Sequence, residues 1–89
     1  MADFKPLFKL TVLSPNELIY EKEVHSVFLE GDDGEFELLA YHYPLISVLK
    51  KSDVVINWNE RLPVKGGVVR FFANECTVLV EEEIKKKAS

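Results

Sequence analysis

The segment GDDGEFELLAYHYPL, residues 31–45, begins with the clearest turn in the chain. Gly31 and Gly34 supply positive φ at no steric cost, and the two aspartates between them can hydrogen-bond to their own backbone. A run of strand formers at residues 26–30 leads into this turn, and a short apolar piece at 36–40 follows it. The segment therefore predicts a tight turn between two extended pieces of chain.

Outward from this turn, apolar and polar residues alternate with period two far more clearly than with the helical period of about 3.6. Phe8, Leu10 and Val12 alternate with Lys9 and Thr11, which is typical of a half-buried strand. Such runs recur every ~8–12 residues and predict eight or nine strands in an all-β sandwich or barrel. The expected extended runs are residues 8–12, 18–24, 26–30, 36–40, 45–49, 54–58, 62–65, 68–72 and 77–80, with turns at 59–60 and 73–75 and a bulge or tight bend at 66–67.

The 89-residue chain has the composition of one small globular domain, with 47% hydrophobic and 29% charged residues. Its formal net charge of −4 counts against nucleic-acid binding, which depends on neutralising phosphates. No segment reaches the roughly 20 apolar residues that cross a bilayer, and residues 1–10 do not resemble a signal peptide. Cys76, the only cysteine, cannot form an internal disulfide, which favours a reducing compartment. We expect a soluble cytosolic domain.

Few groups in the sequence could carry chemistry. His25 and His42 have no third partner at a metal-site spacing, so no metal is expected. Cys76 begins a hydrophobic strand and is expected to be a packing residue. The turn at 31–34 lacks the lysine and following helix of a phosphate site and the ligand pattern of a calcium loop. The sequence predicts a protein that is not an enzyme and needs no cofactor.

Two runs, 54–56 and 68–72, are apolar on both faces. A small sandwich buries only one face of each strand in its core. The surplus apolar face predicts a contact with another protein chain, although alternation does not say which face that is. A stacking platform for nucleic acid is disfavoured because no basic groove accompanies the aromatics, which are expected to pack in the sheets. These aromatics are Tyr20, Tyr41, Tyr43, Trp58, Phe71 and Phe72.

Several motifs together resemble one known family, the epsilon subunit of F-type ATP synthases, in its amino-terminal domain. FKLTVLSP at 8–15 and LIYEKEV at 18–24 are similar to its first two strands, VKGGV at 64–68 resembles its later Ser-Gly-Gly element, and TVLV at 77–80 its closing strand. Between 31 and 45 the family typically has Gly-x-x-Gly-x-Phe-Gly-x-Leu-Pro-Gly-His-Ala-Pro-Leu. The positions that match this pattern in register are Gly31, Gly34, Phe36, Leu39, His42, Pro44 and Leu45.

The resemblance implies a ten-stranded β-sandwich over residues 1–83 and a short charged tail over 84–89, without the helical domain that follows it in most family members. It implies a non-catalytic rotor subunit of a proton-translocating ATP synthase, linking the gamma subunit to the membrane ring of c subunits. The subunit would be peripheral to the bacterial inner membrane on its cytoplasmic face, without inserting into the bilayer. It would neither bind ATP nor inhibit hydrolysis through a helical arm.

The resemblance, together with the apolar runs and the glycine turns, leads us to expect three groups of site residues. Contacts with the c ring are expected at Asp32, Asp33, Glu35 and His42. Contacts with gamma are expected at Val55, Val69 and Phe71, and the loops would be shaped by Gly31, Gly34, Pro44, Gly66 and Gly67.

The chain departs from the family pattern at several positions. Glu37 and Tyr41 stand where the family usually has glycine, which implies ordinary negative φ there or a locally altered loop. Ala40 replaces proline, Tyr43 replaces alanine and Lys65 replaces serine. Two other readings stay open: a generic sandwich adaptor that binds another protein through an exposed apolar sheet face, and a small barrel that binds an oligosaccharide or nucleotide.

Overall fold

The computed structural model describes residues 5–81, and this range is built from strands, with no helix. Nine strands follow one another: β1 (Phe8–Leu13), β2 (Leu18–Val24), β3 (Ser26–Gly31), β4 (Gly34–Leu39), β5 (Leu45–Leu49), β6 (Ser52–Ile56), β7 (Glu60–Val64), β8 (Gly67–Phe72) and β9 (Glu75–Val80). The all-β prediction is confirmed. The described range holds nine strands, as the alternation indicated, and not the ten that the family resemblance implied. The predicted tail, 84–89, lies outside the described residues.

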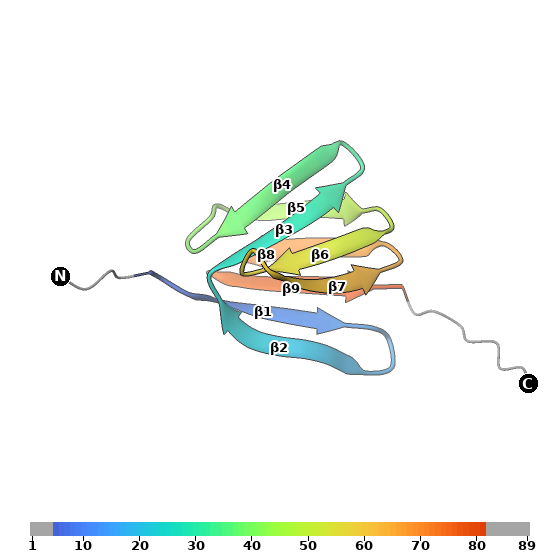
Figure 1. The fold of residues 1–89 in the computed structure, drawn as a ribbon, viewed down its shortest axis with the longest axis horizontal. Coiled ribbons are helices and arrows are strands. Elements are labelled where there is room, and N and C mark those ends of the chain that lie inside the picture. The colour runs from blue at the N-terminus through green and yellow to red at the C-terminus, as the bar shows by residue number, and fades with distance from the viewer. Residues whose placement is uncertain (1–4, 82–89) are drawn as a thin grey trace, which may run out of the picture.

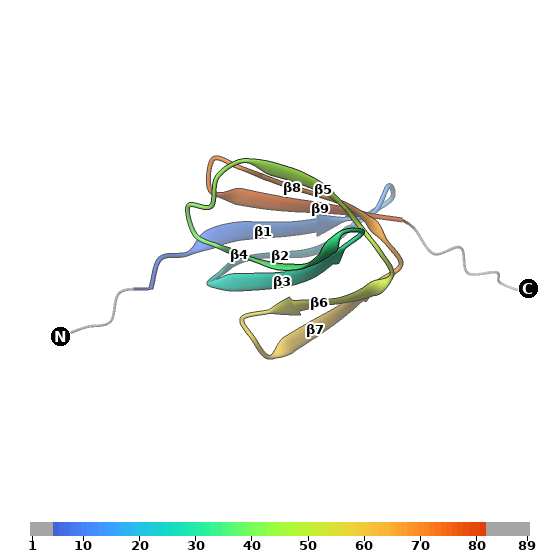
Figure 2. The ribbon, with the colours of Figure 1, turned by 90° about the horizontal axis from the view of Figure 1, so that it is seen from above.

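The strands form one curled sheet that folds into two layers (Figure 1). The first layer has the order β2-β1-β9-β8-β5, and the second has the order β4-β3-β6-β7. A single residue pair, Gly31 with Leu49, joins β3 to β5 and connects the layers. Figure 2 shows the layers edge-on, with β1, β9, β8 and β5 facing β3, β6 and β7. The strand pairs are antiparallel except β1 with β9, which is parallel.

The core lies between the layers and is filled by every second residue of the strands. Phe8, Leu10 and Val12 are buried and the residues between them are half-buried, as the alternation predicted. Phe71 from β8 meets Phe8 edge-on, with ring centroids 5.4 Å apart. Edge-to-face packing suits aromatic rings, whose edges are positive and faces negative. Cys76 is also fully buried, in agreement with its predicted packing role.

Side-chain hydrogen bonds hold the two layers together at their free edges and at the junction of β2 with β3. The Tyr20 hydroxyl on β2 donates to Glu60 Oε1 on β7 at 3.2 Å, which bridges the outermost strands of the two layers. Burial, together with the charge of Glu60, raises the pKa of Tyr20. Asn57 Oδ1 accepts hydrogen bonds from the backbone amides of His25 at 2.7 Å and Ser26 at 3.2 Å, where β2 passes into β3.

Two hairpins are closed by residues with left-handed backbone. Asn57 and Trp58 have φ of 53° and 66°, and Asn59 N donates to Ile56 O at 3.2 Å, which is a type I′ turn. The expected turn at 59–60 is therefore two residues too late, and Trp58 lies in the turn instead of the strand. The other turn, Ala73 and Asn74 with φ of 52° and 62°, lies where the sequence predicted one.

Of the four glycines, Gly67 has the closest approach of a neighbouring backbone. A Cβ at Gly67 would overlap Leu79 O and lie 2.9 Å from Val80 Cα, and its φ of +153° is one that other residues rarely adopt. Gly34 has a comparable φ of +133°, but no atom lies within 4 Å of its added Cβ. Gly67 is therefore required both because a side chain would clash and because of its φ, whereas Gly34 is required only because of its φ.

We predict that Gly67→Ala lowers the free energy of unfolding by about 3 kcal/mol or more, because the methyl group displaces the β8–β9 backbone. Gly34→Ala should cost only about 1–2 kcal/mol, since it meets no atom and bears the φ penalty alone. Urea denaturation of both variants measures the difference. Equal losses of stability in the two variants would show that the backbone moves away from the new methyl group near Leu79 O without an energetic cost.

Candidate functional site

An apolar row crosses the outer face of the first layer. Val68 on β8 pairs with Val48 on β5 and Leu79 on β9, and Leu79 pairs with Leu13 on β1. Val48 is 52% exposed, Val68 39% and Leu79 49%. Leu18 on β2, the partner of Leu13, continues the row to the edge of the sheet. We call these five residues the apolar row.

The surface beside this row is also apolar. Along the row runs a shallow groove of ≈ 420 Å³, lined by Pro15, Val48, Leu49, Gly67, Val68, Leu79, Val80 and Glu81. Ile46 and Phe72 are exposed nearby, on either side of Arg70, whose guanidinium lies 6.0 Å from the centroid of the Phe72 ring. A contiguous apolar surface of this kind marks a site for a protein partner.

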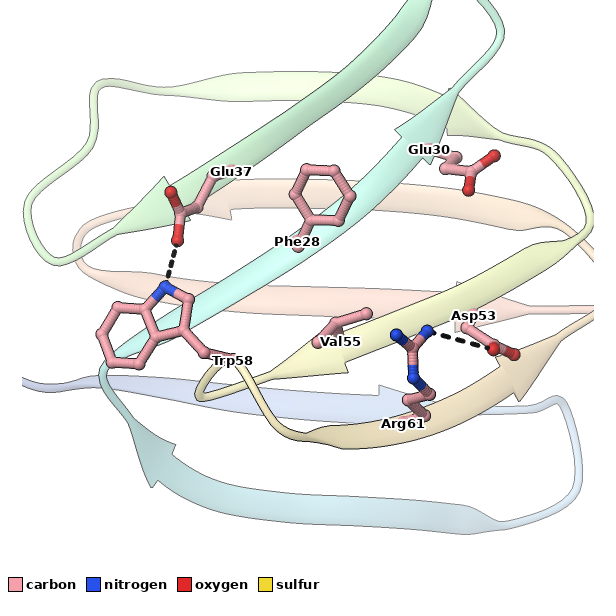
Figure 3. Close-up of a pocket in the computed structure, with 7 residues that line it drawn as sticks. All are labelled: Phe28, Glu30, Glu37, Asp53, Val55, Trp58 and Arg61. Atoms are coloured by element: carbon pink, nitrogen blue, oxygen red, sulfur yellow. Dashed lines mark hydrogen bonds and ion pairs between the residues drawn. The ribbon is translucent and has the colours of Figure 1, made fainter.

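The structure separates the expected gamma contacts. Val69 and Phe71 are both 0% exposed and belong to the core, so their side chains present no surface to another chain. This corrects the choice of face in β8: the outward residues are Val68 and Phe72. Val55 is half-buried and faces outward from the other layer, in a hollow beside Trp58 (Figure 3). The register of β8 against β5 and β9 shows which residues of β8 lie on the outer face of the sheet. The alternation of apolar residues alone could not show this, because β8 has apolar residues on both faces.

The expected ring contacts lie at opposite ends of the sandwich. Asp32 and Asp33 form the exposed β3–β4 turn and Glu35 follows at the start of β4, at the end where β1, β9 and β5 finish (Figure 1). His42 lies in the β4–β5 connection, at the other end. The fifteen-residue segment 31–45 runs the length of the sandwich as β4, which carries its two ends apart.

His42 is held by its own neighbours. Its ring centroid lies 4.5 Å from that of Tyr43 and 5.7 Å from that of the buried Phe71. Its Nδ1 lies 2.7 Å from Tyr43 O, within hydrogen-bonding distance. These contacts anchor the connection between β4 and β5 onto the core, while Pro44 leads it into β5.

Tyr41 has a left-handed backbone conformation, which glycine adopts without steric cost, at a position where the family usually has glycine. Its φ is 65°, so the expectation of negative φ is wrong at this residue, whereas Glu37 lies in regular β4. Asn74 Oδ1 accepts from Tyr41 N at 2.6 Å, and Asn74 Nδ2 donates to Leu7 O at 3.0 Å. The Asn74 side chain therefore links the β4–β5 connection to the segment before β1. The sequence marked Asn74 as a turn residue but did not reveal these two hydrogen bonds.

The described residues offer little for catalysis. Burial raises the pKa of the Cys76 thiol to about 12, which keeps it protonated and unreactive near neutral pH. Nowhere in residues 5–81 do three potential metal ligands gather. Within the same range there is no helix that could cross a membrane.

Comparison with known proteins identifies the family. Residues 7–86 match the family described as the beta-sandwich domain of the ATP synthase delta/epsilon chain. The chain belongs to this family. The ATP synthase epsilon chain of Chlorobium limicola is 30% identical to it over 86 residues, which cover 92% of this delta/epsilon-family chain and 98% of the relative. The epsilon chain of Lactobacillus delbrueckii subsp. bulgaricus is 28% identical over 88 residues, and the chain spans 60% of that relative's length.

Solved structures share the fold of this delta/epsilon-family chain at low sequence identity. A chain from the central stalk and c ring of the Tetrahymena thermophila mitochondrial ATP synthase matches 90% of it, with a TM-score of 0.70 and 13% identity, over 71% of that chain. A chain of the Euglena gracilis mitochondrial ATP synthase matches 89% with a TM-score of 0.76 and 15% identity, over 53% of that chain. The predicted family and its sandwich fold are confirmed.

We predict that Tyr41→Gly raises the free energy of unfolding by about 0.5–1 kcal/mol, because glycine adopts positive φ without steric cost. Tyr43→Gly is the control at a tyrosine of equal exposure without positive φ. It should cost about 1–2 kcal/mol, because glycine adds entropy to the unfolded chain and the ring contact with His42 is lost. Urea denaturation of both variants provides the measurement. A loss of stability in Tyr41→Gly would mean that the tyrosine ring contributes more than the strain removes.

Proposed function

We propose that this chain is the sandwich domain of a non-catalytic epsilon subunit in the rotor of a proton-translocating F-type ATP synthase. The family match over residues 7–86 carries the proposal. Its relatives are named as epsilon chains, and its structural neighbours come from ATP synthases, one of them from a central stalk and c ring. The subunit links gamma to the c ring and thereby couples ion flow to ATP synthesis.

The apolar row is the surface that binds gamma. It crosses all five strands of the first layer, so a partner lying on it contacts a continuous hydrogen-bonded sheet and not a loop. Burying the exposed parts of Val48, Val68 and Leu79 supplies a favourable hydrophobic term. Aromatic Phe72 and cationic Arg70 beside the row are the residue types that are enriched at protein interfaces.

The acidic β3–β4 turn is the end that faces the c ring. Asp32, Asp33 and Glu35 are exposed there, and side-chain contacts with other described residues do not occupy them. His42 is not part of this contact, because it lies at the other end of the sandwich and packs on Phe71. Binding gamma on a sheet face and the ring at an adjoining end gives the domain two separate attachments.

The role of the domain is mechanical. The nine strands of residues 5–81 are paired along most of their length, and the Tyr20–Glu60 hydrogen bond joins the outer edges of the two layers, which makes the domain a stiff connection between gamma and the ring. It is held at the cytoplasmic face of the membrane by these partners.

We predict that Val68→Asp raises the Kd for the gamma subunit at least about 100-fold, because the complex would bury an unpaired charge. Val55→Asp carries the same change on the outer face of the other layer and should leave the Kd within about threefold. Calorimetric titration against purified gamma measures both, with thermal melts to show that each variant is folded.

The opposite ranking of these two variants would move the gamma site to the second layer. If the unmodified chain fails to bind gamma at micromolar concentration, the adaptor function with another protein partner replaces the rotor function. Val69→Asp is unsuitable as a binding test, since its charge would enter the core.

We predict that Asp32→Asn combined with Glu35→Gln weakens binding of the gamma–epsilon subcomplex to the detergent-solubilised c ring about two- to fivefold, as expected for exposed charge contacts. Glu23→Gln with Glu75→Gln makes the same charge change at the opposite end and should have no effect. Co-sedimentation at two salt concentrations measures both pairs. If both double variants weaken binding to the c ring equally, the ring responds to the net charge of the domain. If Asp32→Asn with Glu35→Gln does not weaken binding, the β3–β4 turn does not contact the ring.

A further inference from the structure

A second hollow lies on the outer face of the second layer, on the opposite side of the sandwich from the apolar row. It has a volume of ≈ 400 Å³ and spans β4, β3, β6 and the β6–β7 hairpin (Figure 3). Phe28 and Val55, which pair across β3 and β6, form its apolar floor. The residues that line it are Phe28, Glu30, Glu37, Asp53, Val55, Trp58 and Arg61.

One end of the hollow holds an indole and a carboxylate in a fixed arrangement. Trp58 Nε1 donates to Glu37 Oε2 at 2.7 Å, and Ser26 Oγ donates to the same oxygen at 2.5 Å. Among the described residues, both hydrogen-bond donors to Glu37 bind its Oε2. Glu37 Oε1 can therefore accept a hydrogen bond from an incoming group. The type I′ turn at Asn57 and Trp58 sets the indole beside the hollow, and Asn57 is itself bonded to the β2–β3 junction.

The charge of the hollow favours a cation. Three carboxylates and one guanidinium line it, which leaves two net negative charges. Arg61 pairs with Asp53 at 3.5 Å at the far end from Trp58, so it does not cover the indole (Figure 3). The indole already attracts one cation of this chain, since Lys5 Nζ lies 6.0 Å from its centroid. An anionic ligand would meet the carboxylates of Glu30, Glu37 and Asp53.

We propose that this hollow binds the guanidinium group of an arginine presented by a partner protein. A guanidinium is planar, so it can stack on the Trp58 indole and donate to Glu37 Oε1 along the edge of the same plane. It is also more weakly hydrated than an ammonium, which suits a hollow with an apolar floor. Phe28 and Val55 accommodate the methylene groups of the arginine.

This site is separate from the proposed gamma surface, because it lies on the layer away from the apolar row. Its Glu30 end borders the acidic turn, since Glu30 pairs with Glu35. Glu37 and Trp58 come from different hairpins, and only the pairing of β3 with β4 and β6 brings them together. The family that the chain resembles usually has glycine at the position of Glu37. The site is therefore a feature of this chain and not of the shared contacts with gamma and the ring.

The experiment titrates the full chain with N-acetylarginine amide and follows the fluorescence of Trp58, the only tryptophan in the sequence. Amide NMR spectra locate the binding site. The isosteric neutral probe is N-acetylcitrulline amide, and N-acetyllysine amide tests the choice of cation. Glu37→Gln removes the charge while its side-chain oxygen can still accept from Trp58. Glu17→Gln, an exposed acid in the β1–β2 turn, is the control with the same charge change.

We expect saturable binding of the arginine probe in the millimolar range, with shifts at residues 28, 37, 55 and 58. Glu37→Gln should weaken it at least fivefold, with an unchanged thermal melt, and Glu17→Gln should not weaken it. Equal binding of the citrulline probe, or equal effects of the two variants, would overturn the site. Tighter binding of the lysine probe would overturn the assignment to arginine. No saturable change up to 50 mM (a limit of about −1.8 kcal/mol) would also overturn it.

Discussion

The sheet passes from one layer of the sandwich to the other through a single residue pair, Gly31 with Leu49. A Cβ at Gly31 would lie 3.1 Å from Ser47 Oγ, 3.2 Å from the Phe36 ring and 3.3 Å from Val48 O, so the absence of a side chain permits this corner. Asp32 N donates to Val48 O and Lys50 N to Glu30 O on either side of it, which satisfies the backbone where the ladder ends. The strand pairing between the layers passes through this corner, which brings the two layers face to face.

Closing the layers divides each strand into a core face and an outer face. In β8 both faces carry apolar residues, and burial of Val69 and Phe71 follows from which side of the sheet meets the second layer. The pairing of Val68 with Val48 and Leu79 then gathers the outward apolar residues into a row. A one-residue shift in register would exchange the two sets, and this is why the apolar row is a property of the pairing and not of any single strand.

The length of β4 gives the domain two chemically different ends. The turn at 32–33 is acidic and exposed, while the connection after β4 carries aromatic residues and is clamped by Asn74. Strain at Tyr41 persists because the Asn74 side chain, the His42–Phe71 contact and the bond from His42 N to Leu39 O at 3.2 Å all fix this connection. The β4–β5 connection is therefore fixed at several points, which suits the proposed mechanical function.

The sequence by itself determined the strand content, the sharp turn at 31–34, the core residues of β1 and the family, because alternation, glycine spacing and ordered motifs are local properties of the chain. It did not determine which face of β8 is outward, where His42 lies relative to Asp32, or that Trp58 meets Glu37. The tertiary structure decided these, since each depends on pairing between strands that are distant in sequence.

Trp58 is the clearest case. Its alternation with Ile56 predicted a strand residue, but the Asn57 side chain bonds to the β2–β3 junction and draws the chain into a turn two residues early. Local pattern carries information about burial and extension, whereas a site assembled across strands exists only once their register is set.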